Sequence, residues 1–265
     1  MKDVDNTKEF RCISLCTGYA GIELGLRRVV PTLRTVAYVE VEAFACANLV
    51  AKMEAGYLDA APIWTDIKTF DGQPFYKRVH IVTGGYPCQP FSVAGKREGT
   101  KDPRHLWPYI ARIVQAVRPV WCFFENVPGH LTSGFPEVYR SLRDMGYSVE
   151  AGLFTAAECE LDIERERLFV LARTLRYGFI DVCCKKQSKV IKKGCVFPQG
   201  RGQRPVKRLG SSFFPGESKK WESKAEFCGN DNEIAWQVDR LRLLGNGVVP
   251  AQAERAFRYL MGLFK

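Results

Sequence analysis

Short apolar runs alternate with segments of helical spacing along the first two-thirds of the chain. The runs are rich in β-branched and aromatic residues and end in glycine or polar residues, and apolar positions three or four residues apart follow them. Strands that alternate with helices are typical of a mostly parallel, doubly wound α/β sheet. The expected strands are 11–16, 35–41, a short edge at 64–67, 79–85 and 120–127, and the expected helices are 22–30, 43–54, 106–118 and 136–146.

The pattern changes in the last third of the chain. Segments 147–156 and 167–172 predict two further strands that could pair at the edge of the sheet. No sustained period follows until about Asn232, in a stretch rich in Lys, Gly, Ser and Pro, and helical spacing returns at 251–264. We therefore expect three parts: a large domain at 1–172, a small irregular module at 173–232 and a segment at 233–265 that returns to the large domain.

Composition argues against membrane proteins and disulfide-stapled secreted domains. Hydrophobic residues make up 46% and charged residues 26%, and no apolar run approaches the ~18 residues of a membrane span. The first residues lack the basic start and apolar stretch of a secretory signal. The 10 cysteines are spread along a chain too large for a disulfide mini-scaffold. We expect a soluble protein of a reducing compartment, with most cysteines as buried free thiols.

Positive charge is concentrated in one segment. The net charge is +10, and residues 173–224 hold 14 Lys and Arg against 3 Asp and Glu. A near-neutral body with one strongly basic insert is typical of a protein that binds phosphate groups. A solvated basic loop would have the same composition.

A glycine-containing turn follows the first strand and predicts a ligand site. Glycines there let backbone N–H groups approach a ligand at the positive end of a helix, although such a turn can also be purely structural. Glu40 ends the second strand near the ~20-residue offset at which an acid binds a ribose, and the glycine spacing fits a nucleoside without pyrophosphate. Asp66 is a candidate acceptor for an adenine amine, or equally a helix N-cap. The turn comprises Cys16, Thr17, Gly18, Tyr19, Ala20 and Gly21.

A cysteine framed by prolines follows the strand expected at 79–85. Cys88 stands in the string GGYPCQPFS, beyond the carboxyl end of that strand, where ligand sites lie in open α/β sheets. A thiol there can act as a nucleophile if its thiolate is favoured. Single cysteines are more often structural, but the two prolines and the glycine pair argue against simple core filling.

Charged residues lie at the ends of the next strands on the same edge of the predicted sheet. Glu125 ends the strand at 120–127, and a carboxyl group with restricted solvent can stay protonated and donate to a ring nitrogen. Arg165 and Arg167 come just before or at the start of the last strand, where alternation points both to one face. Alone, each also fits an ordinary exposed acid or a charged edge strand.

Together and in this order, the motifs resemble those of DNA cytosine-5 methyltransferases. The strings are PCQPFS, ENV, RER and a closing GNGVVP, and the resemblance covers roughly 11–172 and 240–264. Four ordered motifs arise by chance far less often than one, so the structural readings above lose most of their weight. The resemblance implies a Rossmann-like, class I S-adenosylmethionine-dependent methyltransferase with a small irregular recognition domain.

The resemblance also implies a mechanism. Cys88 would attack carbon 6 of a flipped-out cytosine in double-stranded DNA, while Glu125 holds N3 and the exocyclic amine. Carbon 5 then becomes nucleophilic enough to take the sulfonium methyl group. Arg167, with Arg165, would contact the base oxygen and steady the negative charge that builds up. A base removes the carbon-5 proton, and elimination frees Cys88.

The implied cofactor is S-adenosyl-L-methionine, bound on the 16–21 turn, and no metal is required. Glu40 would bind the ribose, Asp66 and Ile67 the adenine, and Asn246 would lie near the methionine end. The full set for the cofactor is Cys16, Thr17, Gly18, Tyr19, Ala20, Gly21, Glu40, Val41, Asp66, Ile67 and Asn246.

The DNA contacts implied by the resemblance fall in two segments. Residues 95–107 match the family's mobile loop after the nucleophile, and the basic insert at 173–224 occupies the position of its target-recognition region. The candidates are Ser92, Lys96, Arg97 and Arg104 near the nucleophile, and Lys192, Lys193, Arg204 and Lys207 in the insert.

Three departures from the family pattern stand out. Asp162 and Ile163 occupy positions where Pro and Gln are usual, so one base or loop contact is in doubt. Cys16 replaces a phenylalanine, which weakens an expected stacking contact with the adenine. The recognition region is short, which suggests a short or loosely defined DNA site and an orphan or virus-encoded bacterial enzyme.

Several alternatives stay open. An RNA cytosine-5 methyltransferase of the same fold is one, since one branch of the family modifies transfer RNA. That branch usually carries a Cys-Phe-Thr motif, and the nearest string here is Glu226-Phe227-Cys228. A catalytically silent DNA-binding relative is another, although the catalytic motifs are intact. Zinc-ligand spacing is poorly matched by the cysteines of the insert, Cys183, Cys184, Cys195 and Cys228.

The remaining expectations concern partners and place. We expect a monomer without membrane contact, and a partner restriction endonuclease stays open. We expect the cytoplasm of a bacterial or phage-infected cell.

Overall fold

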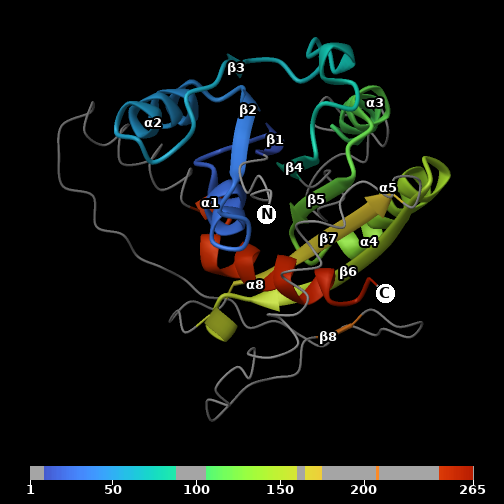
Figure 1. The fold of residues 1–265 in the computed structure, drawn as a ribbon. Helices are drawn as coiled ribbons and strands as arrows, with labels where there is room; N and C mark the ends of the chain where they lie inside the picture. The colour runs from blue at the N-terminus through green and yellow to red at the C-terminus, as the bar shows by residue number, and fades with distance from the viewer. Residues whose placement is uncertain (1–8, 88–105, 160–164, 175–206, 209–244, 265) are drawn as a thin grey trace, which may run out of the picture.

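A single mixed sheet organises the molecule. The computed structural model describes residues 9–87, 106–159, 165–174, 207–208 and 245–264. Within these residues the sheet has 8 strands in the order β3-β2-β1-β4-β5-β7-β6-β8 (Figure 1). The strands are β1 Phe10–Leu15, β2 Leu33–Val39, β3 Ile63–Trp64, β4 Ile81–Gly85, β5 Trp121–Asn126, β6 Tyr147–Thr155, β7 Glu166–Thr174 and β8 Lys207–Arg208.

The described helices follow the expected alternation with the strands. They are α1 Gly21–Arg27, α2 Ala43–Glu54, α3 Trp107–Val117, α4 His130–Ser133, α5 Phe135–Asp144 and α8 Pro250–Met261, with 3-10 turns η1 Gln73–Phe75 and η3 Ala157–Cys159. The sequence pattern placed all of these α-helices except the single turn α4. The doubly wound α/β prediction is confirmed.

Strand direction changes halfway across the sheet. The strands β3, β2, β1, β4 and β5 pair in parallel, whereas β7 pairs antiparallel with both β5 and β6. Antiparallel neighbours need no helical crossover, so the short connection from β6 to β7 suffices. The two strands do continue the sheet beyond β5, but β7 lies inside, between β5 and β6. This order places the residues that begin β7 directly beside the end of β5.

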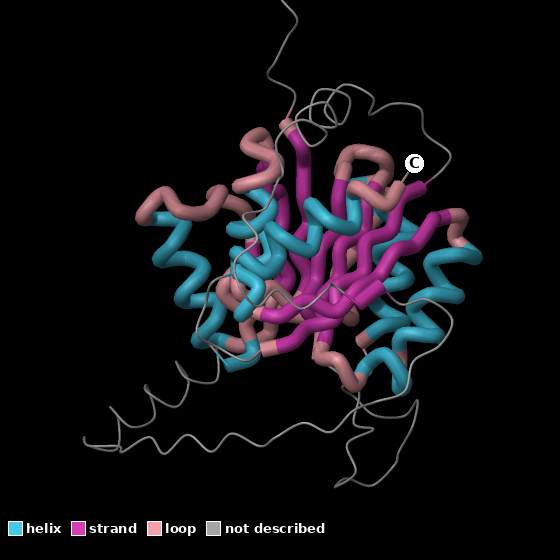
Figure 2. Tube along the Cα trace, turned by 90° about the horizontal axis from the view of Figure 1, so that it is seen from below, coloured by secondary structure: helices cyan, strands magenta, loops and turns pink. Residues whose placement is uncertain are grey.

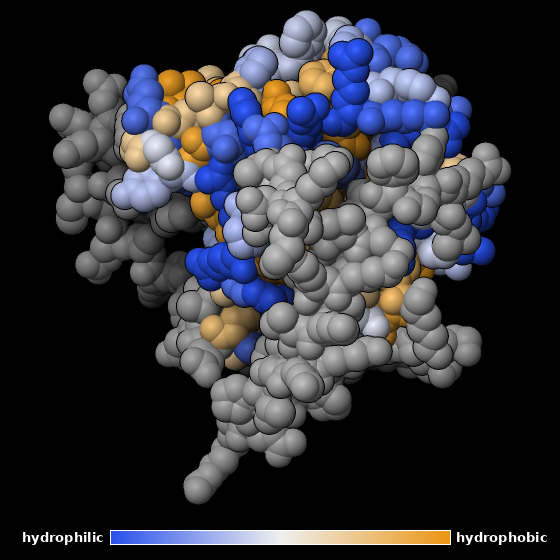
Figure 3. Space-filling model, in the orientation of Figure 1, coloured by the Kyte–Doolittle hydropathy of each residue, from blue (hydrophilic) through white to orange (hydrophobic). Residues whose placement is uncertain are grey.

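Helices cover both faces of the sheet, as Figure 2 shows. Alternate residues of a strand point to opposite faces. In β1, Ile13 and Leu15 belong to a core formed with α3 and α5, whereas Cys12 belongs to a second core formed with α1 and α8. In the face that Figure 3 shows, hydrophilic residues predominate over the described upper surface.

The C-terminal helix docks on the main domain, as its apolar spacing predicts. Helix α8 packs against α1 and the strands β6 and β7. A Cβ on Gly25 would collide with the Pro250 carbonyl and lie 2.9 Å from Ala253 Cβ, so the close approach of the two helices needs a glycine. The end of the chain is therefore built into the same core as its first helix.

The proposed domain boundaries fall mostly outside the described residues. From the insert at 173–232, the structure describes the end of β7 and the strand β8, whose backbone pairs antiparallel with Gly152 and Leu153 of β6. The boundaries stay predictions. Among the described residues, no helix is long and apolar enough to cross a membrane.

Candidate active site

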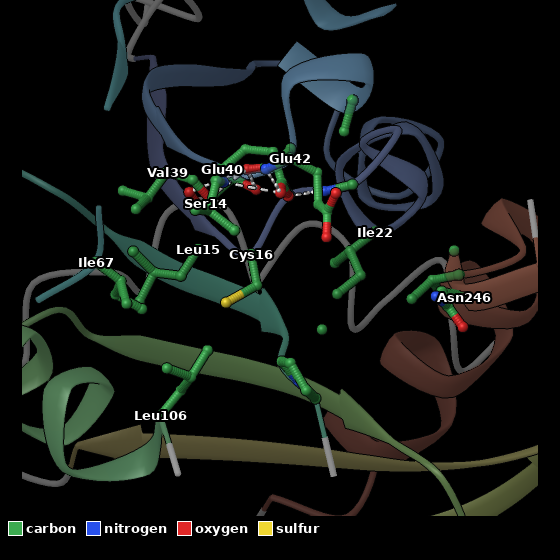
Figure 4. A pocket seen from close by; sticks show the side chains of 18 of the residues that line it. Ser14, Leu15, Cys16, Ile22, Val39, Glu40, Glu42, Ile67, Leu106 and Asn246 are labelled. Carbon is green, nitrogen blue, oxygen red and sulfur yellow. Dashed lines mark hydrogen bonds between the residues drawn. The ribbon is translucent and has the colours of Figure 1, made fainter. Parts of the chain in front are cut away.

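A cavity opens at the carboxyl ends of β1, β2 and β4. Its volume is about 740 Å³, within the usual range for small-molecule sites. Acidic groups lie on one side of it and apolar side chains on the other (Figure 4). The lining residues include Ser14, Leu15, Cys16, Thr17, Gly18, Gly21, Ile22, Glu23, Glu40, Val41, Asp66, Ile67, Gly85, Pro87, Leu106, Asn246, Gly247 and Val248.

The turn after β1 brings backbone N–H groups to this cavity. Cys16, Gly18 and Ala20 all have positive φ, at 49°, 56° and 65°. Nothing lies within 4 Å of a Cβ built on Gly18, so its glycine serves the backbone conformation rather than a close contact. The alternation of left-handed residues lets the chain turn sharply from β1 into α1.

Glu40 ties this turn to the end of β2. Its side chain is 7% exposed and accepts hydrogen bonds from the backbone N–H groups of Gly18 at 2.7 Å, and of Val41 and Glu42 at 2.9 Å (Figure 4). Three N–H donors hold the carboxylate in place at the cavity wall. It keeps acceptor positions for hydroxyl groups of a ligand.

Asp66 both lines the cavity and stabilises its own turn. Its Oδ1 accepts from Lys68 N–H at 2.9 Å, and its backbone oxygen accepts from the N–H groups of Thr69 and Phe70. The two interpretations of this residue, ligand acceptor and cap of a helical turn, are therefore compatible. Ile67, next in the chain, is buried at the apolar side of the cavity.

The apolar side of the cavity includes a thiol. Cys16 projects into the space between Leu15, Ile67 and Leu106 (Figure 4). Burial, together with the nearby Glu40 carboxylate, raises the pKa of the Cys16 thiol to about 12. The thiol is thus neutral near pH 7, and it offers a smaller contact surface than an aromatic ring.

Two residues of the predicted cofactor turn do not line the cavity. Ala20 is fully buried below the turn. Tyr19 is not among the lining residues; its hydroxyl donates to the carbonyl of Val248, which does line the cavity, and its ring lies 4.9 Å from Lys52 Nζ. The other nine residues predicted to bind the cofactor all line the cavity: Cys16, Thr17, Gly18, Gly21, Glu40, Val41, Asp66, Ile67 and Asn246.

A buried acid lies beside the cavity at the end of β5. Glu125 is 5% exposed and pairs with Arg167 Nε at 2.9 Å. In the parallel register it stands opposite Gly85, and a Cβ on Gly85 would lie 3.2 Å from Glu125 Oε2. Burial raises the pKa of Glu125 to about 7, although Arg167 and Arg165 both act to lower it. The carboxyl group can therefore hold a proton near neutral pH.

Arg165 and Arg167 approach Glu125 from the start of β7. Both lower the pKa of that acid, so both guanidinium groups act on the same carboxyl. The Arg165 side chain donates to the Gly247 carbonyl, and its pKa is lowered by burial and by Arg167. The expectation that the two arginines share one face agrees with this cluster of charges.

The chain that leads to the predicted nucleophile is anchored at the same place. Asn126 Nδ2 donates to the Tyr86 carbonyl at 3.0 Å, and the Tyr86 hydroxyl is 3.0 Å from His130 Nε2. Pro87 lines the cavity. Cys88 itself is the next residue and lies outside the described residues, as do Ser92, Lys96, Arg97, Arg104, Lys192, Lys193 and Arg204.

Comparison with known proteins decides the family. The family model for C-5 cytosine-specific DNA methylase matches residues 10–254. The chain belongs to this family. The match includes every element around the cavity, so the resemblance seen in the four sequence motifs is confirmed.

Two of the relatives are named type II methyltransferases. The chain is 32% identical over 174 residues to M.NgoMIV of Neisseria gonorrhoeae, which covers 64% of this chain and 53% of the relative. It is 27% identical over 259 residues to M.CviJI of Paramecium bursaria Chlorella virus IL3A, covering 96% and 59%. This chain thus spans a little over half the length of these relatives.

Solved structures show the same fold. The S. pombe Dnmt2 methyltransferase aligns with a TM-score of 0.52 at 24% identity, over 64% of this chain and 52% of that one. A prophage-encoded E. coli protein, named as a putative DNA modification methyltransferase, aligns with a TM-score of 0.51 at 20% identity, over 63% of this chain and 47% of that one.

Sequence reasoning missed several residues of this candidate site. Glu23 is 1% exposed, lines the cavity and accepts a hydrogen bond from Thr83 Oγ1. Asn126 and His130 hold the segment before Cys88. An Asn directly after the strand-end Glu125 was a visible signal, whereas a glutamate inside a helix reads as a solvated charge until packing shows otherwise.

The described residues contain no cluster of His, Cys, Asp and Glu that could hold a metal ion. The four cysteines weighed as zinc ligands lie outside them. The zinc alternative is therefore untested by these contacts.

Proposed function

We propose that this protein is a DNA cytosine-5 methyltransferase that uses S-adenosyl-L-methionine and acts through Cys88. The observation that carries the proposal is the buried Glu125, paired with Arg167 and lying against Gly85, three residues before Cys88. A carboxyl group with its pKa near 7 can donate a proton to a weakly basic ring nitrogen. Family membership supplies the reaction class.

The cavity fits the proposed cofactor by the chemistry of its donors and acceptors. Glu40 offers a fixed carboxylate to ribose hydroxyl groups, and the apolar patch with Ile67 suits an adenine ring with Asp66 beside its amine. Asn246, in the C-terminal segment, also lines the cavity, so a methionine end bound beside it would face that segment. When bound, the cofactor supplies an activated methyl group at its sulfonium sulfur.

The chain's own residues prepare the cytosine. The Cys88 thiolate adds to carbon 6 and the ring electrons move toward N3, where the Glu125 proton receives them. Arg167 and Arg165 stabilise the negative charge at the base oxygen. Carbon 5 is then nucleophilic and accepts the methyl group. Loss of the carbon-5 proton to a base, expulsion of the Cys88 thiolate and return of the N3 proton to Glu125 restore the aromatic ring and the starting state of both residues.

The DNA contacts remain part of the proposal. Carbon 6 is inaccessible in stacked DNA, so the cytosine must be extruded. Lys96, Arg97 and Arg104 follow the nucleophile, and the basic insert would supply phosphate contacts through residues such as Lys192 and Lys207. Because M.NgoMIV and M.CviJI are named type II methyltransferases, we extend the proposal to a partner endonuclease.

The test is transfer of labelled methyl groups from S-adenosyl-L-methionine to DNA by the wild-type chain and by Cys88→Ala. We expect the variant to lose transfer and keep cofactor binding by calorimetry, with the buried Cys122→Ala as a matched control that retains activity. DNA with 5-fluorocytosine at the methylated site should form a denaturation-resistant adduct with the wild type alone. Transfer to transfer RNA but not to DNA would contradict the proposed substrate.

A further inference from the structure

The C-terminal segment binds both the side chain and the backbone of Arg165. The guanidinium donates from Nη2 to the Gly247 carbonyl, and the backbone oxygen of Arg165 accepts from Gln252 Nε2 at 2.9 Å. Gln252 is completely buried, and the same Nε2 donates to the Phe154 carbonyl at 2.7 Å. One short segment, 247–252, therefore sets both the side chain and the backbone of this arginine.

Tyr19 binds the next carbonyl of the same segment. Its hydroxyl donates to the Val248 carbonyl, while Lys52 Nζ donates to the Tyr19 carbonyl at 2.8 Å and lies over its ring. A Cβ on Gly21 would overlap the Val248 carbonyl, so the turn itself lies directly against the segment. Tyr19 belongs to the turn after β1, and its hydroxyl binds the segment whose peptide groups contact Arg165.

These contacts join the two ends of the site. Gly247 and Val248 line the cavity, and their carbonyl groups are bound by Arg165 on one side and Tyr19 on the other. Arg165 and Glu125 both act on the pKa of the Tyr19 hydroxyl, which burial raises, so the hydroxyl lies within the electrostatic reach of the buried acid. A shift of this segment would move Arg165 relative to Glu125.

We propose that Tyr19 and Gln252 are positioning residues for methyl transfer, which orient Arg165 toward the base through residues 247–252. The proposal rests on the proposed function, because it assigns Arg165 a base to contact. Neither residue needs to touch cofactor or base. Their effect is on the alignment of a charged group at the reacting end, where small displacements are costly.

Tyr19→Phe isolates the hydroxyl, since it keeps the ring beneath Lys52. We expect kcat to fall roughly 10-fold with the KM for S-adenosyl-L-methionine changed less than about 2-fold, since the loss is one of alignment. The alkaline limb of the kcat profile should move to higher pH, because a displaced Arg165 no longer helps to lower the pKa of Glu125. Tyr57→Phe, at an exposed tyrosine, is the matched control.

Gln252→Met removes the second support and nearly preserves the side-chain volume. Both variants are then repeated in an Arg165→Ala background, because residues that act through one group lose their separate effects when that group is absent. We expect Tyr19→Phe and Gln252→Met to reduce kcat in the wild-type chain and to have no further effect without Arg165.

The possible results separate this inference from the proposed function. If the wild type does not methylate DNA, both are wrong. If the wild type is active and Tyr19→Phe has the same kcat and pH profile, only the positioning role is overturned. A raised KM for the cofactor with unchanged kcat overturns it as well, since Tyr19 would then act on cofactor binding. Effects that persist in full without Arg165 show an ordinary structural role.

Discussion

The two ends of the site are built in different ways. At the proposed cofactor end, the Glu40 carboxylate is held by the backbone N–H groups of Gly18, Val41 and Glu42. At the other end, Glu125 is buried beside Arg165 and Arg167, and burial outweighs both positive charges in setting its pKa. Backbone donors hold the Glu40 carboxylate in position, whereas burial beside two arginines sets the pKa of Glu125. The first arrangement suits binding, and the second suits chemistry.

Of the substitutions that test this contrast, Glu125→Gln should have the largest effect on catalysis. The amide keeps the shape and can still accept from Arg167, but it loses the acidic proton. We expect kcat to fall by about 10²–10³-fold, the usual loss for one group that stabilises a transition state, with cofactor affinity unchanged. Steady-state methyl transfer and calorimetry measure the two quantities. The control is Glu166→Gln, which should stay near wild type. Glu166 lies between Arg165 and Arg167 in the chain, so strand alternation points it to the opposite face.

The pH profile should show the same acid directly. The pKa of Glu125 is raised from 4.5 to about 7, so its neutral form is present below pH 7 and is lost above it. We expect kcat to fall about 10-fold per pH unit on the alkaline side. Because the folded pKa is raised, the stability contributed by this proton is complete below pH 4.5 and disappears as pH rises through 7. Denaturant unfolding at pH 5 and pH 8 measures this change in the free energy of unfolding. If the same pH dependence remains in Glu125→Gln, it does not come from Glu125.

Glu40→Gln should have a smaller effect, and it should change cofactor binding instead of catalysis. The amide places an NH₂ group where backbone N–H donors now point, and it loses the charge-assisted acceptor for a ribose. We expect the Kd for S-adenosyl-L-methionine to rise about 10-fold, while kcat at saturating cofactor changes little. Glu42→Gln, at an exposed acid of the same wall, is the control. A loss of kcat alone would break the division between the two ends.

The smallest expected effect concerns the packing that joins the ends. Gly25→Ala introduces a Cβ against Pro250 and Ala253, which should destabilise the fold by about 1–3 kcal/mol through overpacking. Gly129→Ala is the matched control, since nothing lies within 4 Å of its Cβ. Thermal unfolding compares the two. Equal melting temperatures would mean that α8 adjusts freely against α1.

The sequence predicted the alternation of strands and helices well because that signal is local. Each apolar run and each helical face is written in adjacent residues, and the motif order identified the family before any contact was known. It did not predict that β7 lies between β5 and β6, because strand order depends on which pairing buries the most surface, a property of the whole sheet. The positions of Tyr19 and Glu23 escaped prediction for the same reason.

Some features of the site are therefore determined by local sequence, and others arise only in the tertiary structure. Spacing and residue type determined the turn at 16–21, the acids at the strand ends and the prolines around Cys88, since strand periodicity and turn chemistry act within a few residues. Only the tertiary structure determines that Glu125 is buried enough to hold a proton near pH 7 and that the Tyr19 hydroxyl binds the Val248 carbonyl. Desolvation and long-range packing bring together residues that are far apart in the sequence, such as Tyr19 and Val248, which are separated by 229 positions, and a local sequence pattern does not encode such contacts.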